Sequence, residues 1–206
     1  MIAVIDYGVG NLFSLCRSLE AIGQEPVVTG DPALLRRADK LFLPGVGAFA
    51  DAAAKLRQTG LDQVIQEEVA KGKPILGICL GMQLLFEESH EFGTWQGLGL
   101  IPGKVVPMEG VIPAGYKIPH IGWNALHFPQ GKRHPLLETV GEGACVYFVH
   151  SFYATDCDEA VIATAEYGPE LTAAVAKGNV MGCQFHPEKS GDVGLAILKT
   201  FCEGSW

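Results

Sequence analysis

The sequence lacks any long apolar run, since no segment approaches the about 20 consecutive hydrophobic residues that a helix needs to cross a membrane. It also opens without the basic segment and cleavage site of an export signal, which predicts a cytoplasmic protein. None of the six cysteines belongs to a Cys-x-x-Cys pair, so neither a disulfide framework nor a zinc site is expected. The thiols are therefore predicted to stay reduced.

Positive charge is scarce as well, because 15 Lys and Arg residues are outnumbered by 23 Asp and Glu residues, for a formal net charge of −8. This balance does not provide the basic surface that binding to a nucleic-acid backbone requires. Hydrophobic residues nevertheless make up 48% of the 206 residues, and 26 glycines allow many tight turns. The composition is typical of a packed globular enzyme, and the length predicts one domain over residues 1–206.

The N-terminal half alternates short apolar runs with stretches of helical periodicity, the order expected of a parallel sheet covered by helices on both faces. Asn11 and the pair Asp31-Pro32 stand where helices favour such residues, at the N-cap and the first turn. The pattern predicts an α/β fold with an open, doubly wound, mostly parallel sheet. Its strands are predicted at Ile2–Ile5, Val27–Thr29, Lys40–Leu43 and Pro74–Ile78, and its helices after Asn11 and Asp31, over Phe49–Lys71 with a break at Gly60, and over Gly81–Ser89.

The C-terminal half contains short β-like runs separated by Gly, Pro and Asn, which predicts an antiparallel extension of the sheet. An amphipathic stretch over Val193–Cys202 predicts a closing helix. The β-like runs are Lys104–Val106, Ala144–Val149, Val161–Thr164, Thr172–Val175 and Val180–Gln184.

Cys79 stands between two glycines, in Gly77-Ile78-Cys79-Leu80-Gly81, where a predicted strand passes into a predicted helix. Small residues on both sides permit the tight turn of a nucleophile elbow. A thiol at the N-terminus of a helix ionises more readily, and the thiolate is the form that attacks. This pattern predicts a nucleophile at Cys79, whereas a structural role is expected for Cys16, Cys145, Cys183 and Cys202.

A second motif, His186-Pro187-Glu188, follows the predicted strand Val180–Gln184 and supplies an imidazole with a carboxylate close by. A cysteine nucleophile needs both, an imidazole to move its proton and an acid to orient the imidazole. Open α/β sheets place such groups beyond the carboxyl ends of their strands. Of the other histidines, only His120 and His150 are not readily explained as loop or surface residues.

The two motifs together resemble the class I, or triad, glutamine amidotransferases, in which a Gly-x-Cys-x-Gly elbow is followed far downstream by His-Pro-Glu. This resemblance implies a flavodoxin-like α/β fold and a reaction in which Cys79 takes the side chain of L-glutamine as a thioester and ammonia leaves. It implies that His186 moves the proton and that Glu188 orients His186. The segment Pro44–Gly47 also matches, which implies an oxyanion hole built from Gly45, Val46, Gly47 and Leu80.

Further segments resemble the glutaminase subunits of imidazole glycerol phosphate synthase, an enzyme of histidine biosynthesis. The matching segments are Asp6–Asn11, Pro44–Phe49, Cys79–Glu87, Pro119–Asn124, Tyr147–Ser151 and His186–Ser190. By this resemblance, glutamine is bound by Gln83, Glu91, His150, Ser151 and Phe152.

The same resemblance implies a partner, a separate (β/α)8 cyclase that forms a heterodimer with this chain. The cyclase would receive ammonia through a protected channel and make imidazole glycerol phosphate and aminoimidazole carboxamide ribonucleotide. Because the glycine-flanked segment Gly45–Gly47 is expected beside the nucleophile, the hypothesis is that it switches the glutaminase on when the cyclase binds its own substrate. The interface residues that the resemblance implies are Asn11, Trp123, Asn124, Tyr147 and Lys189.

Other interpretations explain fewer residues. Gly8-Val9-Gly10 suggests a dinucleotide site, but Phe13 stands in the place of the third glycine. The alternative within enzymes is another member of the superfamily, such as the glutaminase of pyridoxal phosphate synthesis or a cysteine peptidase, and Pro119–Asn124 argues against both. A catalytically inactive binding module would not need the three triad residues together. The spacing of the His and Cys residues fits no metal site, and neither a metal nor a cofactor is expected.

Overall fold

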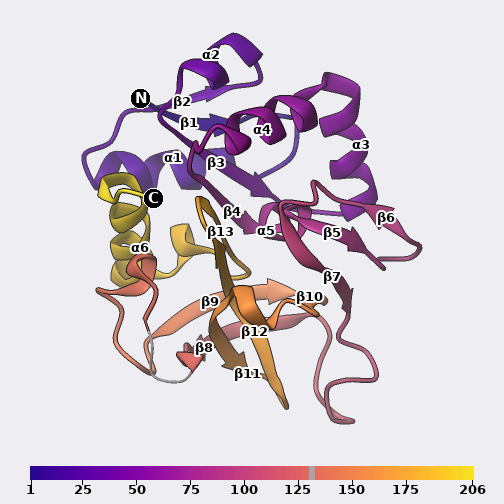
Figure 1. Cartoon of the computed structure of the whole chain (residues 1–206). Helices are drawn as coiled ribbons and strands as arrows, with labels where there is room; N and C mark the ends of the chain where they lie inside the picture. The colour runs from indigo at the N-terminus through magenta and orange to yellow at the C-terminus, as the bar shows by residue number, and fades with distance from the viewer. Residues whose placement is uncertain (130–132) are drawn as a thin grey trace.

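The computed structural model describes residues 1–129 and 133–206, and at its centre lies a seven-stranded sheet (Figure 1). The sheet consists of β1 (Ile2–Ile5), β2 (Pro26–Thr29), β3 (Lys40–Gly45), β4 (Ile75–Cys79), β11 (Val161–Glu166), β12 (Glu170–Lys177) and β13 (Val180–Cys183). Their order across the sheet is β11-β12-β13-β4-β3-β1-β2. The five strands from β13 to β2 are parallel, and β12 and β11 are antiparallel additions, so the predicted fold class is confirmed.

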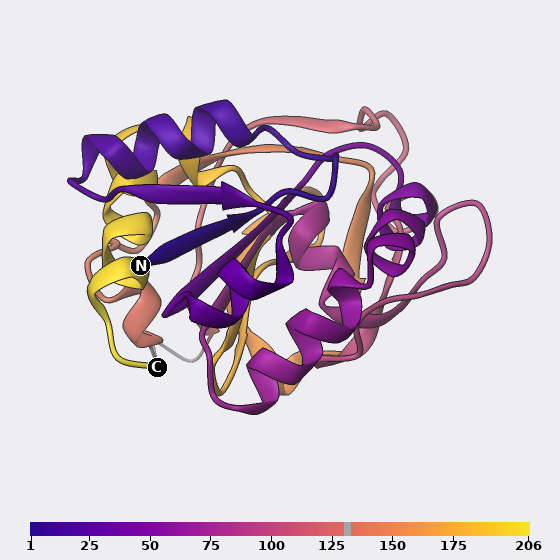
Figure 2. The ribbon, with the colours of Figure 1, turned by 90° about the horizontal axis from the view of Figure 1, so that it is seen from above.

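Helices cover both faces of this sheet, as Figure 2 shows from above. The helices are α1 (Leu12–Ala21), α2 (Pro32–Arg37), α3 (Phe49–Thr59), α4 (Leu61–Ala70) and α6 (Gly191–Glu203). α1 and α6 lie on one face, where Leu15 and Ile197 belong to one buried cluster, and α2 to α4 lie on the other, where Leu56 and Ile65 belong to a second. In the described parts of the chain, no helix is both long enough and apolar enough to pass through a membrane.

Local signals set the helix boundaries. The Asn11 side chain accepts a hydrogen bond from the N–H of Ser14 at the start of α1, and Asp31 accepts one from Ala33 at the start of α2. Gly60 adopts a left-handed backbone, with φ 69°, between α3 and α4. The predicted helix starts and the break at Gly60 are therefore confirmed.

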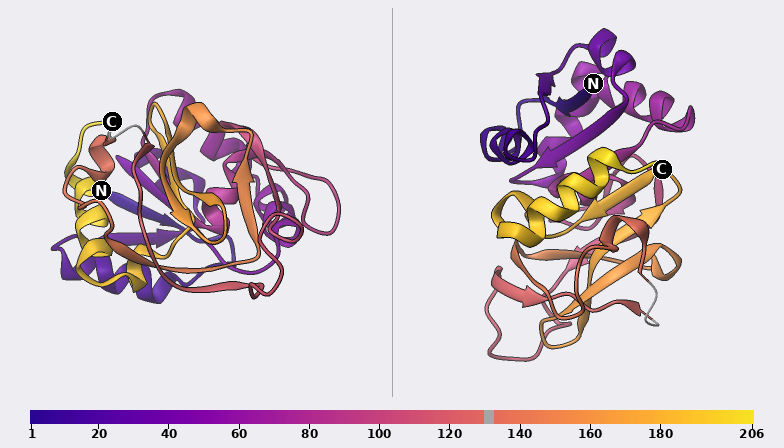
Figure 3. Two further views of the ribbon diagram at one scale, coloured as in Figure 1. Left: turned by 90° about the horizontal axis from the view of Figure 1, so that it is seen from below. Right: turned by 90° about the vertical axis from the view of Figure 1, so that its left-hand side faces the viewer.

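Two smaller sheets lie beyond the carboxyl ends of β4 and β13, in the middle and lower parts of Figure 1, and Figure 3 shows the same region from two other sides. One has the order β10-β7-β5-β6, and the other pairs β8 with β9. Their strands are β5 (Phe86–Ser89), β6 (Trp95–Gln96), β7 (Ile101–Pro107), β8 (His120–Ala125), β9 (Cys145–His150) and β10 (Phe152–Thr155). Strands β6, β8 and β10 were not predicted, whereas β9, β11, β12 and β13 lie where β-like runs were predicted.

The predicted helix over Gly81–Ser89 is wrong. The helix α5 spans only Leu80–Leu84, and Phe86–Ser89 forms β5. The carbonyl oxygen of Leu85 accepts hydrogen bonds from the N–H groups of Leu100 and Ile101, which leads the chain into a sheet with β7. Partners remote in the sequence thus override a local run that satisfies helical periodicity.

Candidate active site

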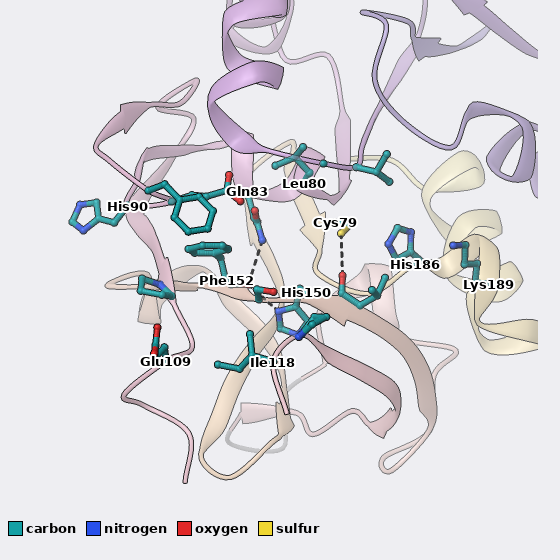
Figure 4. Close-up of a pocket in the computed structure, with 18 residues that line it drawn as sticks. Cys79, Leu80, Gln83, His90, Glu109, Ile118, His150, Phe152, His186 and Lys189 are labelled. Atoms are coloured by element: carbon teal, nitrogen blue, oxygen red, sulfur yellow. Dashed lines mark hydrogen bonds between the residues drawn. The ribbon is translucent and has the colours of Figure 1, made fainter. Parts of the chain in front are cut away.

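Two neighbouring parallel strands bring the two sequence motifs together. β13 pairs with β4 so that Cys183 lies opposite Ile78, and both strands leave the sheet at the same edge. The chain therefore reaches Cys79 directly after β4 and His186 shortly after β13. Both side chains line one cavity of about 970 Å³, and Figure 4 shows them next to each other.

The backbone at Cys79 has the unusual conformation of a nucleophile elbow, with φ 54° and ψ −111°. A non-glycine residue with positive φ is strained by about 1–3 kcal/mol, and such residues concentrate at active sites. The flanking glycines are sterically required, because a Cβ on Gly81 would lie 1.7 Å from the carbonyl oxygen of Leu43. A Cβ on Gly77 would lie 2.7 Å from the carbonyl oxygen of Gly81.

His186 is held between an acid and a sulfur. Its Nδ1 lies 2.8 Å from Oε1 of Glu188, and both side chains are 3% exposed. Because Glu188 occupies Nδ1, Nε2 is the ring nitrogen available to Cys79. Burial lowers the pKa of His186, but its hydrogen bonds to Cys79 and Glu188 outweigh burial and raise this pKa to about 9. The arrangement favours an imidazolium beside the sulfur.

The backbone around His186 is fixed by a side chain that the sequence reasoning missed, Ser190. Its hydroxyl donates to the carbonyl oxygen of His186 at 2.6 Å and accepts from the N–H of Tyr147 at 3.0 Å. The carbonyl oxygen of Tyr147 in turn accepts from the N–H of His186 at 2.9 Å. Strand β9 therefore supports the turn that carries His186.

Gln184 is a second residue that the sequence reasoning missed. Its Nε2 lies 3.7 Å from the sulfur of Cys79, and its Oε1 accepts a hydrogen bond from Nε2 of Gln83 at 3.0 Å. The Cys79 thiol also lies 3.9 Å from the carbonyl oxygen of Val149, another residue that lines the cavity. The position of Gln184, two residues before His186, was the one available signal.

The predicted oxyanion segment lies beside the elbow. Gly45 ends β3 directly opposite Cys79 of β4, and Val46 and Gly47 line the cavity. Leu80 begins α5, where backbone N–H groups have no acceptor within the helix. Backbone N–H groups of the kind that hold an oxyanion are therefore present on both sides of the sulfur.

Tyr7 anchors the start of this segment, which the sequence reasoning also missed. Its hydroxyl donates to the carbonyl oxygen of Pro44 at 2.9 Å. Burial raises the pKa of Tyr7 well above its usual value, and the neighbouring Cys79 acts in the same direction. The hydroxyl therefore stays protonated and keeps this hydrogen bond at every pH in the physiological range.

The five residues predicted to bind glutamine all line the same cavity: Gln83, Glu91, His150, Ser151 and Phe152. The carbonyl oxygen of Phe152 accepts from Nε2 of Gln83 at 3.3 Å and from Nδ1 of His150 at 2.8 Å. Glu91 accepts a hydrogen bond from the N–H of Phe49 at the start of α3. The arrangement places one fixed carboxylate and several backbone groups near the nucleophile.

The predicted interface residues are brought together only in part. Trp123 and Tyr147 lie opposite each other on β8 and β9, with ring centroids 6.0 Å apart, and Nζ of Lys189 lies 5.8 Å from the Tyr147 ring. Asn124 points to the other face of β8, where its side chain contacts His120, and Asn11 caps α1. Trp123 is 56% exposed and so is available to a partner.

Within residues 1–129 and 133–206, no group of three or more His, Cys, Asp and Glu side chains is arranged to hold a metal ion.

Comparison with known proteins matches residues 3–203 to the family model described as glutamine amidotransferase class-I. The chain is 53% identical to imidazole glycerol phosphate synthase subunit HisH of Geobacillus sp. (strain WCH70), over 98% of this chain and 95% of the relative. It is 50% identical to the protein of the same name from Geobacter sulfurreducens, over 98% of each. Among solved structures, PurLQS from Thermotoga maritima superposes with a TM-score of 0.77 at 22% identity, covering 98% of this chain and 96% of that one.

Proposed function

The chain belongs to the glutamine amidotransferase class-I family, and we propose that it hydrolyses L-glutamine with Cys79, His186 and Glu188. It is an enzyme subunit of histidine biosynthesis, the glutamine amidotransferase of an imidazole glycerol phosphate synthase. The observation that carries the catalytic assignment is the position of His186, hydrogen-bonded to Glu188 at 2.8 Å and next to the strained Cys79 in one cavity. Residues 1–206 are proposed to act as one domain.

The first half of the reaction forms a thioester. The Cys79 thiolate attacks the side-chain carbonyl carbon of glutamine, and a carbon–sulfur bond forms while the oxygen becomes an oxyanion. N–H groups of Leu80 and of Gly45, Val46 or Gly47 stabilise this oxyanion, and each such donor typically contributes about 3 kcal/mol. The His186 imidazolium donates its proton to the departing nitrogen, the carbon–nitrogen bond breaks, and ammonia leaves.

The second half restores the enzyme. Neutral His186 takes a proton from water, the resulting hydroxide attacks the thioester, and the carbon–sulfur bond breaks. Cys79 leaves as a thiolate beside a His186 imidazolium, and glutamate releases one proton to the solvent. Glu188 keeps His186 in the orientation that presents Nε2 to the sulfur.

The substrate is proposed to enter the cavity with its polar end between Glu91, Gln83 and the backbone at Ser151 and Phe152. The Glu91 carboxylate supplies the negative charge that a substrate ammonium requires. The N–H of Phe49 fixes this carboxylate, which lowers the entropy cost of binding.

The names of the relatives describe a subunit, so this chain works within a complex. We propose that its partner is a (β/α)8 cyclase, which forms a heterodimer with this chain and receives ammonia from the cavity. The heterodimer is proposed to work in the cytoplasm. Support comes from the exposed side chains of Ile121 and Trp123 on β8, which are 59% and 56% exposed, and from Lys189, which lines the cavity beside Tyr147. Asn11 and Asn124 are proposed to contribute polar contacts.

Replacement of Cys79 by Ala tests the triad. Glutaminase activity is expected to fall by at least about 10³-fold, because the nucleophile is lost while the binding groups remain. Cys145→Ala, at an exposed thiol, is the matched control and should retain activity and the same far-UV circular dichroism. Activity that persists in the folded Cys79→Ala protein would refute the assignment.

Co-purification with a candidate cyclase tests the partner. The reconstituted pair should form imidazole glycerol phosphate from glutamine, and ammonia release should rise when the cyclase carries its ligand. Equal ammonia release by the chain alone and in the loaded complex would reject control by the partner and leave the hydrolysis intact.

A further inference from the structure

A continuous series of hydrogen-bond contacts runs from the cavity proposed to bind glutamine to the end of β11. It begins at the carbonyl oxygen of Phe152, which lies 2.8 Å from Nδ1 of His150. Nε2 of His150 lies 3.1 Å from Nδ1 of His120, and Nε2 of His120 lies 2.7 Å from Oδ1 of Asn124. Nδ2 of Asn124 lies 2.9 Å from the carbonyl oxygen of Glu166, which is the last group in this series of contacts.

These four contacts need four hydrogens, one for each. Both ends are backbone carbonyl oxygens, which only accept. A neutral imidazole offers one N–H and one lone pair, and an amide offers N–H groups on one side and an oxygen on the other. The two histidines and Asn124 therefore supply three hydrogens to the chain.

No reassignment removes this deficit. A change of tautomer at His120 or His150 moves the missing hydrogen to another contact, and a flip of the Asn124 amide moves it to Glu166. When His120 and His150 are both neutral, one of the four contacts must join two hydrogen-bond acceptors, which repel each other. All four contacts can form together only when one ring carries an additional proton.

We propose that His120 is a positioning residue that shares one additional proton with His150, and that this proton holds the Ser151–Phe152 segment in place for glutamine. The proton comes from solvent and converts the pair to one shared imidazolium. The link to glutamine rests on the proposed function, whereas the number of protons in the pair does not.

The surroundings of the pair both oppose and support the charge. Burial lowers the pKa of His120 and of His150, the latter to about 4, and positive charge on His120 or His186 also lowers the pKa of His150. In the opposite direction act the fourth hydrogen bond and the faces of two aromatic rings. Tyr167, in the turn between β11 and β12, stacks on the His120 ring at 3.9 Å, and Phe148 of β9 stacks on it at 5.2 Å.

Because these opposing effects nearly cancel, the pair binds the additional proton weakly, and loss of this proton breaks one of the four contacts. As the pH rises toward neutral, the pair loses the proton and one of the four contacts opens. The carbonyl oxygen of Phe152 is shared with Gln83, so release of His150 changes the groups that face the substrate.

Asn124 offers two substitutions with opposite expected effects. Asn124→Ala removes the contacts with His120 and Glu166 and leaves two contacts for two neutral rings, so no additional proton is needed. Asn124→Asp leaves a carboxylate beside His120, which should raise the midpoint of proton uptake by about one to three pH units. If the Asn124 hydrogen bonds had only a structural role, the two substitutions would not be expected to change proton uptake in opposite directions.

The test is nuclear magnetic resonance of the full-length chain with ¹⁵N-labelled histidine, between about pH 4 and about pH 8. The wild-type rings of His120 and His150 should titrate together with one midpoint, with three ring N–H hydrogens below it and two above. Asn124→Ala should abolish the joint uptake, and Asn124→Asp should move the midpoint upward. His127→Gln, at a surface histidine, is the control and should leave the midpoint unchanged.

Two outcomes would overturn the proposal: two ring N–H hydrogens throughout the range, or independent titration of the two rings in the wild-type chain. Kinetics then test the link to glutamine. At pH values above the midpoint of proton uptake, the wild-type KM should rise about tenfold. In Asn124→Ala, KM should lose this pH dependence. A pair that binds the proton without any change in KM would refute positioning, whereas absence of glutaminase activity would refute the proposed function and leave the proton count standing.

Discussion

The hydroxyl of Ser190 lies 2.6 Å from the carbonyl oxygen of His186 and donates a hydrogen bond to it. The hydroxyl oxygen of Ser190 also accepts a hydrogen bond from the N–H of Tyr147, so one buried hydroxyl joins the His186 turn to β9. The position of the imidazole therefore depends on a residue that does not touch the substrate.

Replacement of Ser190 by Ala should lower kcat by about 10- to 100-fold, because a small displacement of His186 weakens proton transfer. KM should change little, since Ser190 does not line the cavity. Steady-state kinetics on the folded variant measure both constants. Ser18→Ala is the matched control, because the Ser18 hydroxyl contacts the same turn only through a 3.5 Å bond to the carbonyl oxygen of Glu188. An equal loss in both variants would contradict the role of Ser190.

The alkaline limit of activity should follow His186. Its pKa is raised to about 9, so the imidazolium that protonates the leaving nitrogen persists through neutral pH and is lost as the pH rises through about 9. A plot of kcat/KM against pH should therefore decrease on its alkaline side. Glu188→Gln removes one of the two groups that raise the pKa and should move the fall to lower pH. Glu142→Gln, which alters a surface contact to His127, should leave the alkaline decrease unchanged. If the alkaline decrease did not move in Glu188→Gln, Glu188 would not be the group that raises the pKa of His186.

Gly81→Ala should destabilise the protein by about 3 kcal/mol or more, because the new Cβ would overlap the carbonyl oxygen of Leu43 and push α5 away from β3. Gly141→Ala is the control, since no atom lies within 4 Å of a Cβ built at Gly141. Thermal unfolding compares the two variants. An unchanged melting temperature in Gly81→Ala would show that the elbow can relax.

Lys40→Met should lower the free energy of unfolding by about 1–3 kcal/mol. Nζ of Lys40 donates to the carbonyl oxygens of Phe201, Cys202 and Gly204 at the end of α6, and of these the Phe201 oxygen also accepts from Nε1 of Trp206. Lys199→Met is the control, because its Nζ lies 4.0 Å from Glu203 on the surface of the same helix. Urea unfolding of both variants measures the difference, and equal stabilities would mean that solvent satisfies these carbonyl groups.

Local signals made much of the fold predictable. The alternating strands and helices of the N-terminal half depend on hydrophobic period and on caps such as Asn11 and Asp31, which are properties of neighbouring residues. The elbow at Cys79 was predictable for the same reason, since its two glycines lie within two residues of it. β5 was mispredicted because its hydrogen bonds go to β7 rather than to the adjacent chain.

The supporting residues of the site could not be predicted from local patterns. Ser190, Gln184 and Tyr7 act through hydrogen bonds to residues from other strands, and their types are common in turns and strands. The contact between His120 and His150 arises because β8 pairs with β9 in a register that places them opposite each other. Neither the register nor the pairing has a local sequence signature.

The position of β13 bears on how the protein is made. This strand, Val180–Cys183, inserts between β4 and β12 and so completes the centre of the sheet, although it is the last strand in the chain. During synthesis on the ribosome, the elbow at Cys79 emerges long before the strand that must lie beside it. The nascent chain therefore carries the Cys79 thiol without its imidazole until β13 and the following His186 have left the exit tunnel, and newly made protein is expected to consume no glutamine before then.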